Sequence, residues 1–199
     1  MKPIIMTGDE AVARGAYEAG CKIAAAYPGT PSTEILENLA NYKEVKSRWT
    51  TNEKVALEVA SGAAIGGARA LAAMKHVGLN VAADPLFTMG YCGNSGGLVI
   101  VTADDPGCHS SQNEQDNRFY APAAKLALVE PSDSQECKDY IIEAFEISEK
   151  YDIPVLFRMT TRVCHSKSLV ELGERKDSEV KKYVENPTKY AMLPANARL

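Results

Sequence analysis

The chain has 199 residues, 45% of them hydrophobic and 24% charged, which is the composition of an ordinary globular protein with one core. Its formal net charge is −4, and lysines and arginines do not cluster, which argues against nucleic-acid binding. No apolar run approaches the ~20 residues of a membrane span and no export signal opens the sequence, so we expect a cytoplasmic protein.

The spacing of cysteines and histidines gives no sign of a metal site. Five cysteines stand at wide, irregular gaps without any Cys-x-x-Cys, which predicts reduced thiols rather than disulfides or metal ligands. They are Cys21, Cys92, Cys108, Cys137 and Cys164. Iron–sulfur clusters use closely spaced cysteines, so none is expected within this chain. His76, His109 and His165 also lack the spacing of ligands, and we expect no metal here.

Helical and strand patterns alternate through the first half of the chain. Thr7-Gly8-Asp9-Glu10 is a capping box, and Pro31 suits the first position of a helix, which makes Thr30 an N-cap. The predicted elements are, in order, a helix at 7–19, a strand at 21–27, a helix at 31–42, a strand at 45–51, a helix opening at 53 and a strand at 72–76.

The second half continues the same alternation. Ser111-Gln112-Asn113-Glu114 is another capping box and predicts a polar helix to about residue 120. The elements are a partly helical segment at 78–89 interrupted by proline, a loose segment at 90–97, a strand at 98–102, the polar helix, a strand at 126–130, a long helix ending at 150 and a strand at 153–159. We expect one α/β domain over 1–185 and an interdomain linker over 186–199.

Short apolar strands separated by helices predict a doubly wound α/β fold, with a mostly parallel sheet and helices on both of its faces. In open sheets of this kind, ligands bind beyond the carboxyl ends of the strands. The loops at 27–32, 50–53 and 102–117 follow predicted strands. We therefore expect these loops to meet at one edge of the sheet and to form a site.

The helix that opens at Glu53 is rich in alanine and glycine. Small residues recur along it at spacings of four, three and four, which puts them on one face where another backbone, a second subunit or a flat ligand can come close. They are Ala56, Ala60, Ala63 and Gly67. Glu53 at the mouth of this helix is a candidate for a functional group with a shifted pKa. Thr50-Thr51-Asn52-Glu53 also has the spacing of a capping box, in which Glu53 has only a structural role.

Two loops offer further polar candidates. Thr30 is either a helix cap or a side chain that meets a substrate. The segment 104–118 is dense in hydrogen-bonding groups, and its paired aspartates at 104–105 raise the hypothesis of a metal site, although the Pro-Gly pair after them favours a turn. His109 is either an acid–base group or a solvated loop residue, and Glu114 is either functional or part of its capping box.

Several common catalytic motifs do not occur in the sequence. No Gly-x-x-x-x-Gly-Lys is present, and no Gly-x-Gly-x-x-Gly follows a predicted strand. Gly-x-Ser-x-Gly is missing too. These observations argue against a nucleoside triphosphatase, a common dehydrogenase and an α/β-hydrolase.

Three sets of motifs together resemble a known family. Asn52-Glu53 followed by Gly62 resembles the Asn-Glu…Gly signature of the pyrimidine-binding domain of thiamine diphosphate enzymes. Tyr27-Pro28-Gly29-Thr30-Pro31-Ser32 resembles the Tyr-Pro-x-Thr-Pro-Ser loop of the 2-oxoacid:ferredoxin oxidoreductases. Other segments are similar to the α subunit of the indolepyruvate type of these enzymes and to its interdomain linker: 82–85, 102–107, 109–118 and 192–198. The resemblance covers essentially the whole chain and implies the thiamine diphosphate-binding fold, pyrimidine type.

The resemblance implies oxidative decarboxylation of a 2-oxoacid to an acyl-coenzyme A, with electrons passed to ferredoxin. In this family the residue that matches Glu53 hydrogen-bonds N1′ of the cofactor's aminopyrimidine and favours the imino tautomer, which activates the thiazolium carbon. By analogy, Glu53 is the catalytic residue and Pro28, Gly29 and Thr30 also contact the cofactor. The substrate contacts implied in the same way are Thr30, His109, Gln112 and Asn113.

The resemblance also implies what other parts of an enzyme would supply. The family's Gly-Asp-Gly…Asn motif for diphosphate and magnesium and its ferredoxin-like cysteine runs do not occur in this sequence. Thiamine diphosphate is therefore expected to be shared with a diphosphate-binding domain, and Mg²⁺ and [4Fe-4S] clusters to lie elsewhere in the complete enzyme. Other expected partners are a ferredoxin-like domain, a second oxidoreductase subunit, ferredoxin and coenzyme A, in a dimer. Alone, this portion of a larger enzyme is expected to be inactive.

Two alternatives stay open on sequence grounds. The chain could be the α chain of a split thiamine diphosphate-dependent 2-oxoacid decarboxylase, which needs no iron. It could also be a non-catalytic assembly module with the same fold, in which the small-residue face serves subunit packing and Glu53 serves only its capping box. The identity of the 2-oxoacid is open too, because no arginine stands where pyruvate-specific relatives bind the substrate carboxylate.

Overall fold

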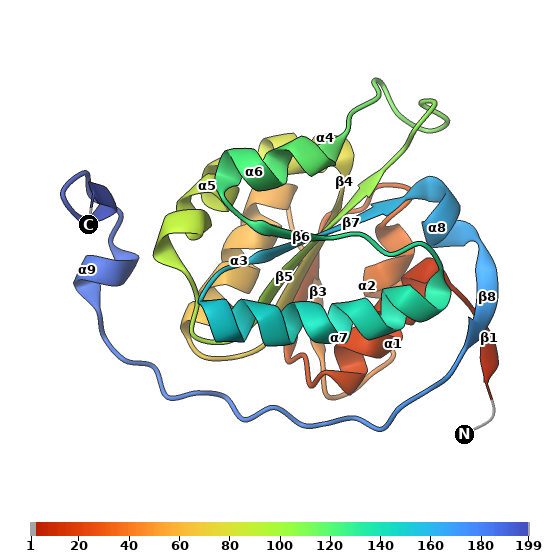
Figure 1. Ribbon diagram of the computed structural model, residues 1–199, viewed down its shortest axis with the longest axis horizontal. Helices are drawn as coiled ribbons and strands as arrows, with labels where there is room; N and C mark the ends of the chain where they lie inside the picture. Colours follow the sequence, from red (N-terminus) through yellow and green to blue (C-terminus); the bar gives the residue numbers. More distant parts are fainter. Residues whose placement is uncertain (1–2, 199) are drawn as a thin grey trace.

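A parallel β-sheet forms the centre of the fold in the computed structural model, which describes residues 3–198 (Figure 1). Within those residues six strands form this sheet in the order β3-β2-β4-β5-β7-β6, and β1 and β8 form a separate antiparallel pair. The strands are β1 (Ile4–Thr7), β2 (Ile23–Ala26), β3 (Lys46–Trp49), β4 (Ala70–Lys75), β5 (Leu98–Asp104), β6 (Ala127–Val129), β7 (Val155–Thr160) and β8 (Lys167–Val170). The helices are α1 (Gly8–Glu18), α2 (Thr33–Leu39), α3 (Glu53–Ile65), α4 (His76–Val81), α5 (Ala83–Cys92), the short η1 (Asn117–Phe119), α6 (Tyr120–Ala124), α7 (Ser134–Tyr151), α8 (Thr161–His165), α9 (Pro187–Tyr190) and the short η2 (Asn196–Arg198).

Helices cover both faces of the sheet, which confirms the predicted doubly wound α/β fold (Figure 1). Helices α1, α2 and α7 pack on one face, and α3, α4, α5 and α6 pack on the other. Strand β4 shows how the sequence supports two cores, since Leu71 and Ala73 belong to the first core and Ala70, Ala72 and Met74 to the second. A strand buried on both faces carries a continuous apolar run instead of an alternating pattern.

Helix α1 begins and ends as the sequence predicts. The Thr7 hydroxyl accepts a hydrogen bond from the Glu10 backbone N–H at 3.2 Å, and the Glu10 carboxylate accepts one from the Thr7 N–H at 2.7 Å. Gly20, just beyond the helix, has a φ of 78°, a left-handed conformation that favours glycine.

The predicted start of α2 is wrong, because Thr30 is not its N-cap. The helix begins at Thr33, two residues after Pro31, and the residue before it is Ser32. The chain first closes a turn in which the Ser32 N–H donates to the carbonyl oxygen of Gly29 at 2.9 Å. The Thr33 hydroxyl then accepts a hydrogen bond from the Gly29 N–H at 2.9 Å. Thr30 therefore lies inside the turn, with its side chain free of any capping role.

Helix α3 begins at Glu53 as predicted, but its cap is Asn52 rather than Thr50. The Asn52 side chain accepts a hydrogen bond from the Val55 N–H at 3.0 Å. The Thr50 hydroxyl instead donates to the carbonyl oxygens of Ala26 at 3.1 Å and Asn52 at 2.8 Å. Glu53 is thus the first residue of the helix, and the capping box that explained it structurally does not form.

The polar helix predicted from Ser111 is also wrong. Residues 111–116 form a loop, and helical structure begins only at Asn117. The Ser111 hydroxyl donates to the Asp105 carboxylate at 2.6 Å, which fixes Ser111 within the loop instead of at a helix start. The Glu114 carboxylate accepts a hydrogen bond from the Gly107 N–H at 2.7 Å, so both members of the expected capping box stabilise the loop.

The small residues of α3 bring this helix close to the sheet. Ala56 and Ala60 are fully buried, and the helix packs against β2 and β4. Of the four residues predicted on this face, Ala56 and Ala60 therefore pack inside the domain, Ala63 is partly buried, and Gly67 lies beyond the end of the helix. Gly62 lies on the exposed side, where an added Cβ would meet no atom within 4 Å.

The C-terminal segment runs along the amino-end edge of the sheet (Figure 1). The Lys176 N–H donates to the carbonyl oxygen of Glu18 at 2.8 Å, and the Lys181 N–H donates to that of Gly67 at 3.0 Å. Glu18 and Gly67 precede β2 and β4, so both hydrogen bonds lie near the amino ends of strands. Tyr190 and Met192 then pack against the core on the α3 side. The linker boundary at 186 stays a prediction.

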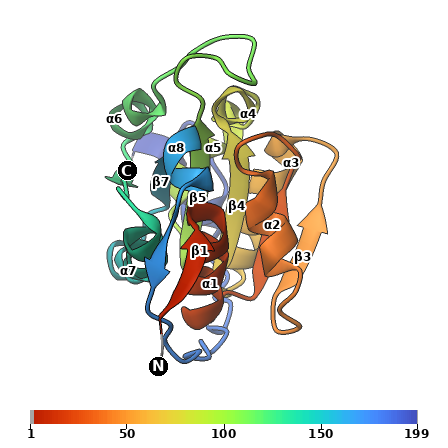
Figure 2. The same ribbon diagram turned by 90° about the vertical axis from the view of Figure 1, so that its right-hand side faces the viewer.

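The antiparallel pair β1 and β8 was not predicted, and it lies beside α8 at one side of the fold (Figure 2). Ile5 and Leu169 in these strands are exposed, so the pattern of a buried strand is missing from both segments. In residues 3–198, no helix combines the length and the apolar character that crossing a bilayer requires.

We expect Gly62→Ala to raise the free energy of unfolding by ~0.5–1 kcal/mol, because alanine is favoured over glycine by that amount in a helix interior. Urea denaturation measures the change. Gly67→Ala is the matched control: its φ is 97° and an added Cβ would lie 2.1 Å from the Lys181 carbonyl oxygen, so this variant should lose stability. A Gly62→Ala protein less stable than the wild type would contradict the open surroundings of Gly62.

Candidate functional site

Three loops meet at the carboxyl-end edge of the sheet, as expected from the order of strands. The loops at 27–32, 50–52 and 105–116 follow β2, β3 and β5, and every neighbouring pair of strands in this sheet is parallel. Strand β4 lies between β2 and β5 and leads directly into α4 at the same edge (Figure 2). The junction of β4 and α4, residues 75–78, therefore lies among the loops.

Glu53 is a half-buried carboxylate that faces α4. A Cβ added at Gly78 would lie 2.6 Å from Cγ and 2.6 Å from Oε1 of Glu53, so the glutamate side chain occupies the space that glycine leaves. Lys54, the next residue, pairs with Asp84 at 3.1 Å and Glu58 at 3.8 Å. These contacts leave Glu53 without an ion pair in the described part of the chain.

The turn at 27–32 is held close to the end of β4. A Cβ added at Gly29 would lie 3.2 Å from Cδ of Lys75, and the Lys75 ammonium donates to the carbonyl oxygen of Ser110 at 2.8 Å. Lys75 thereby connects this turn to the long loop after β5. Pro28 and Thr30 are exposed on the same turn.

Asp105 anchors the long loop at 105–116. Its carboxylate accepts hydrogen bonds from the Ser110 N–H at 2.7 Å, the Ser111 hydroxyl at 2.6 Å and the Thr161 hydroxyl at 3.0 Å. Burial by itself raises the pKa of Asp105, but these hydrogen bonds outweigh it and lower the pKa to about 2, so the carboxylate is charged at neutral pH. The Cys108 N–H donates to the carbonyl oxygen of Asp105 at 3.1 Å, which confirms a turn here.

The other aspartate of the pair, Asp104, is buried in an ion pair. Nε and the second terminal nitrogen of Arg158 each lie 2.9 Å from Oδ2 of Asp104, which also accepts a hydrogen bond from the Asn117 N–H at 3.0 Å. Arg158 contacts Glu130 as well. Both aspartates thus have protein partners, so the structure gives no support to a metal site between them.

His76, the first residue of α4, is a functional-site neighbour that sequence reasoning missed. It is fully buried, and its Nε2 lies 3.0 Å from the carbonyl oxygen of Asn113. Because a carbonyl only accepts, Nε2 carries the hydrogen, and the buried Nδ1 has no partner in the described residues. Residues 75–78 therefore touch all the elements of the site: Gly29, Ser110, Asn113 and Glu53.

Three of the four residues implied as substrate contacts lie on the long loop. His109, Gln112 and Asn113 are exposed, and the Asn113 side chain accepts a hydrogen bond from Gln115 at 2.7 Å. His109 also lines a small hollow with Pro106 and Thr160. The structure brings this loop to the same edge of the sheet as Glu53.

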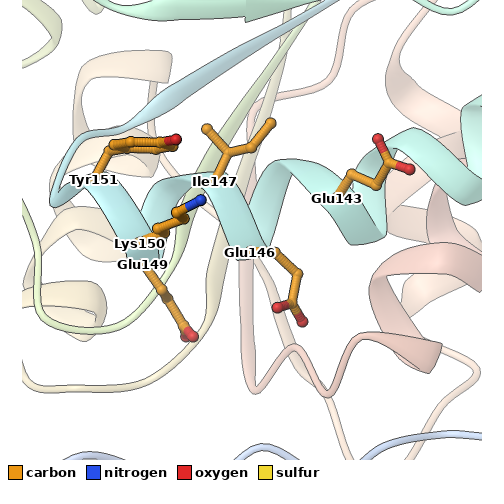
Figure 3. A pocket seen from close by; sticks show the side chains of 6 residues that line it. All are labelled: Glu143, Glu146, Ile147, Glu149, Lys150 and Tyr151. Atoms are coloured by element: carbon orange, nitrogen blue, oxygen red, sulfur yellow. The ribbon is translucent and has the colours of Figure 1, made fainter.

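A different hollow on the outer side of α7 is unrelated to these loops (Figure 3). Its lining residues all belong to one helix: Glu143, Glu146, Ile147, Glu149, Lys150 and Tyr151. The Ser148 hydroxyl in this part of α7 accepts a hydrogen bond from the N–H of Leu98, the first residue of β5, at 2.9 Å. The hollow is therefore near the amino ends of the strands, at the opposite edge from the candidate site.

Comparison with known proteins agrees with the resemblance carried by the motifs. The sequence model of the pyruvate flavodoxin/ferredoxin oxidoreductase family, thiamine diphosphate-binding, matches residues 14–197. The chain is 50% identical to the indolepyruvate oxidoreductase subunit IorA of Archaeoglobus fulgidus, over 98% of this chain and 33% of the relative. It is 48% identical to the subunit of the same name in Methanothermobacter marburgensis, over 98% of this chain and 32% of the relative.

A solved structure supports the fold. The 2-oxoglutarate:ferredoxin oxidoreductase from Magnetococcus marinus, determined with 2-oxoglutarate, coenzyme A and succinyl-CoA bound, matches with a TM-score of 0.80 at 20% identity, over 91% of this chain and 33% of that one. The chain thus spans about a third of the length of the IorA relatives. It belongs to the pyruvate flavodoxin/ferredoxin oxidoreductase family and matches that family's thiamine diphosphate-binding region.

Proposed function

We propose that this chain is the pyrimidine-binding part of a thiamine diphosphate-dependent 2-oxoacid:ferredoxin oxidoreductase of the indolepyruvate type. The reaction is oxidative decarboxylation of an arylpyruvate to an acyl-coenzyme A, with electrons passed to ferredoxin. The names of the two IorA relatives support the substrate class. The observation that carries the proposal is the Glu53 side chain, which packs against Gly78 and has no capping role.

The surroundings of Glu53 fit an aminopyrimidine ring. A carboxylate that lacks an ion pair in the described residues keeps its oxygens free for a ring nitrogen, and the half-buried position strengthens such a hydrogen bond. When bound, thiamine diphosphate supplies an acidic carbon and an electron sink for decarboxylation. Glu53 holds a proton at the ring nitrogen and thereby sets the tautomer.

The two other loops supply contacts around this ring. Pro28, Gly29 and Thr30 line the cofactor, and Thr30 also meets the substrate, since its hydroxyl has no helix to cap. His109, Gln112 and Asn113 offer exposed hydrogen-bonding groups to a polar 2-oxoacid. The Asp105 carboxylate holds the long loop through hydrogen bonds, and Lys75 links that loop to the turn at 27–32, so both are kept in place.

The rest of the enzyme provides what this chain does not carry. A diphosphate-binding domain shares the cofactor and holds Mg²⁺, and [4Fe-4S] clusters of a ferredoxin-like domain carry electrons to ferredoxin. A second oxidoreductase subunit, coenzyme A, a dimeric state and a cytoplasmic location complete the proposal.

The two alternatives differ in testable ways. A non-catalytic module would use Glu53 only in a capping box, but Asn52 caps α3 and Glu53 stands at its first position, which favours the catalytic role. A split decarboxylase would need no iron, so iron analysis of the intact enzyme separates it from an oxidoreductase.

Glu53→Gln in the intact enzyme should lower kcat for indolepyruvate about 10²- to 10⁴-fold, because the amide cannot hold the proton at the ring nitrogen. Steady-state assays of carbon dioxide release measure this effect. Glu58→Gln, an exposed acid on the next turn of the same helix, should retain the wild-type rate. Normal turnover by the Glu53 variant would exclude the proposed role.

Gly78→Ala should lower kcat about 10- to 100-fold, because its Cβ displaces the Glu53 side chain from its position. The loss should disappear in the Glu53→Gln background, where the displaced group no longer acts. Val81→Ala, an exposed position in the same helix, serves as control. Losses that simply add in the double variant would show that Gly78 does not act through Glu53.

A further inference from the structure

Three metal-ligating side chains meet between α1, α2 and α8, away from the contacts described above. Asp9 lies in the first turn of α1, Glu34 in the first turn of α2, and His165 is the last residue of α8. One ligand atom of each lies within 4.8 Å of the other two. Their wide separation along the chain explains why sequence spacing gives no sign of this cluster.

Asp9 has the burial and the scarcity of hydrogen-bond partners that are expected of a metal ligand. Its exposure is 0%, and neither carboxylate oxygen accepts a hydrogen bond from an N–H or O–H group in residues 3–198; the thiol of Cys164, a weak donor, lies beside it. A buried, charged carboxylate with no stronger donor and no cation is strongly unfavourable. Helix α1 lies close to α8 here, since a Cβ added at Gly8 would lie 2.2 Å from the Val163 carbonyl oxygen of α8.

Glu34 and His165 supply the other two ligands, on the side of the cluster that is open to solvent. Oε2 of Glu34 is buried without a hydrogen-bond partner in the described residues and lies 4.0 Å from Nε2 of His165. The side chains of Glu34 and His165 are otherwise 47% and 42% exposed, so water and ions can enter. One imidazole and two carboxylates are donors that Zn²⁺ accepts readily, at four-coordinate sites with water as the fourth ligand.

We propose that a divalent cation such as Zn²⁺ is bound by Asp9, Glu34 and His165. The ion joins the first turns of α1 and α2 to the end of α8. Because α2 begins directly after the turn at 29–32, the ion also restrains one loop of the candidate site. The inference is independent of the proposed enzymatic function, because it rests only on these three side chains.

A proton on the Asp9 carboxyl group competes with the cation. Burial raises the pKa of Asp9 to about 8, with Glu34 and Glu10 adding to the rise and the Cys164 thiol opposing it. In the absence of a cation the carboxyl group is mostly protonated at neutral pH. Burial raises the pKa of the nearby Cys137 thiol, and the Asp9 carboxylate adds to the rise.

Calorimetric titration of the chelator-treated 199-residue chain with Zn²⁺ tests the proposal. The exposed thiol of Cys108 is first removed by Cys108→Ser, so that it cannot bind zinc. We expect saturable binding of a single ion, a higher Tm, and a visible absorption band when Co²⁺ replaces Zn²⁺. His165→Ala and Glu34→Gln should each weaken binding more than tenfold, and Glu37→Gln, an exposed acid on the same helix, should not.

Asp9→Asn should abolish binding, and circular dichroism shows whether this buried variant folds. If it does not fold, the two surface variants still decide the question. Absence of saturable binding, or equal affinity in the wild type and His165→Ala, would overturn the proposal and leave a proton on Asp9.

Discussion

The contact between Gly78 and the Glu53 side chain is the constraint on which the site depends. The glutamate begins α3, the glycine lies in α4, and only the absence of a side chain at Gly78 lets the carboxylate occupy the space between them. The same junction holds Gly29 through Lys75 and the long loop through His76. Three loops that are distant in sequence are therefore positioned by four consecutive residues.

The long loop after β5 is held by Asp104 and Asp105, at the point where that strand ends. Asp105 accepts three hydrogen bonds from its own loop and from α8, and Asp104 is fixed by Arg158 on the neighbouring strand. A carboxylate that accepts several hydrogen bonds, as Asp105 does, orders a loop that has no apolar core of its own. The C-terminal segment follows the opposite edge of the sheet, so it does not cover the edge of the candidate site.

Sequence alone predicted the sheet and its double winding because the inner strands are continuous apolar runs, and it predicted α1 because the capping box of Thr7 is a local interaction. It failed where a side chain has a partner other than the one that capping-box spacing suggests. Ser111 donates to Asp105 instead of capping a helix. Thr50 donates to the Ala26 carbonyl oxygen on another strand, and Asn52 caps α3. The role of residues 75–78 could not be predicted, because it depends on contacts between segments that are distant in the sequence. Gly78 matters because the Glu53 side chain lies against it.

The position of Glu53 relative to bound cofactor is the most direct test of this account. The measurement is a structure of the intact enzyme with thiamine diphosphate. The account predicts a Glu53 oxygen within ~2.6–3.2 Å of a nitrogen of the aminopyrimidine ring. A cofactor bound at this edge with Glu53 turned into solvent would contradict it.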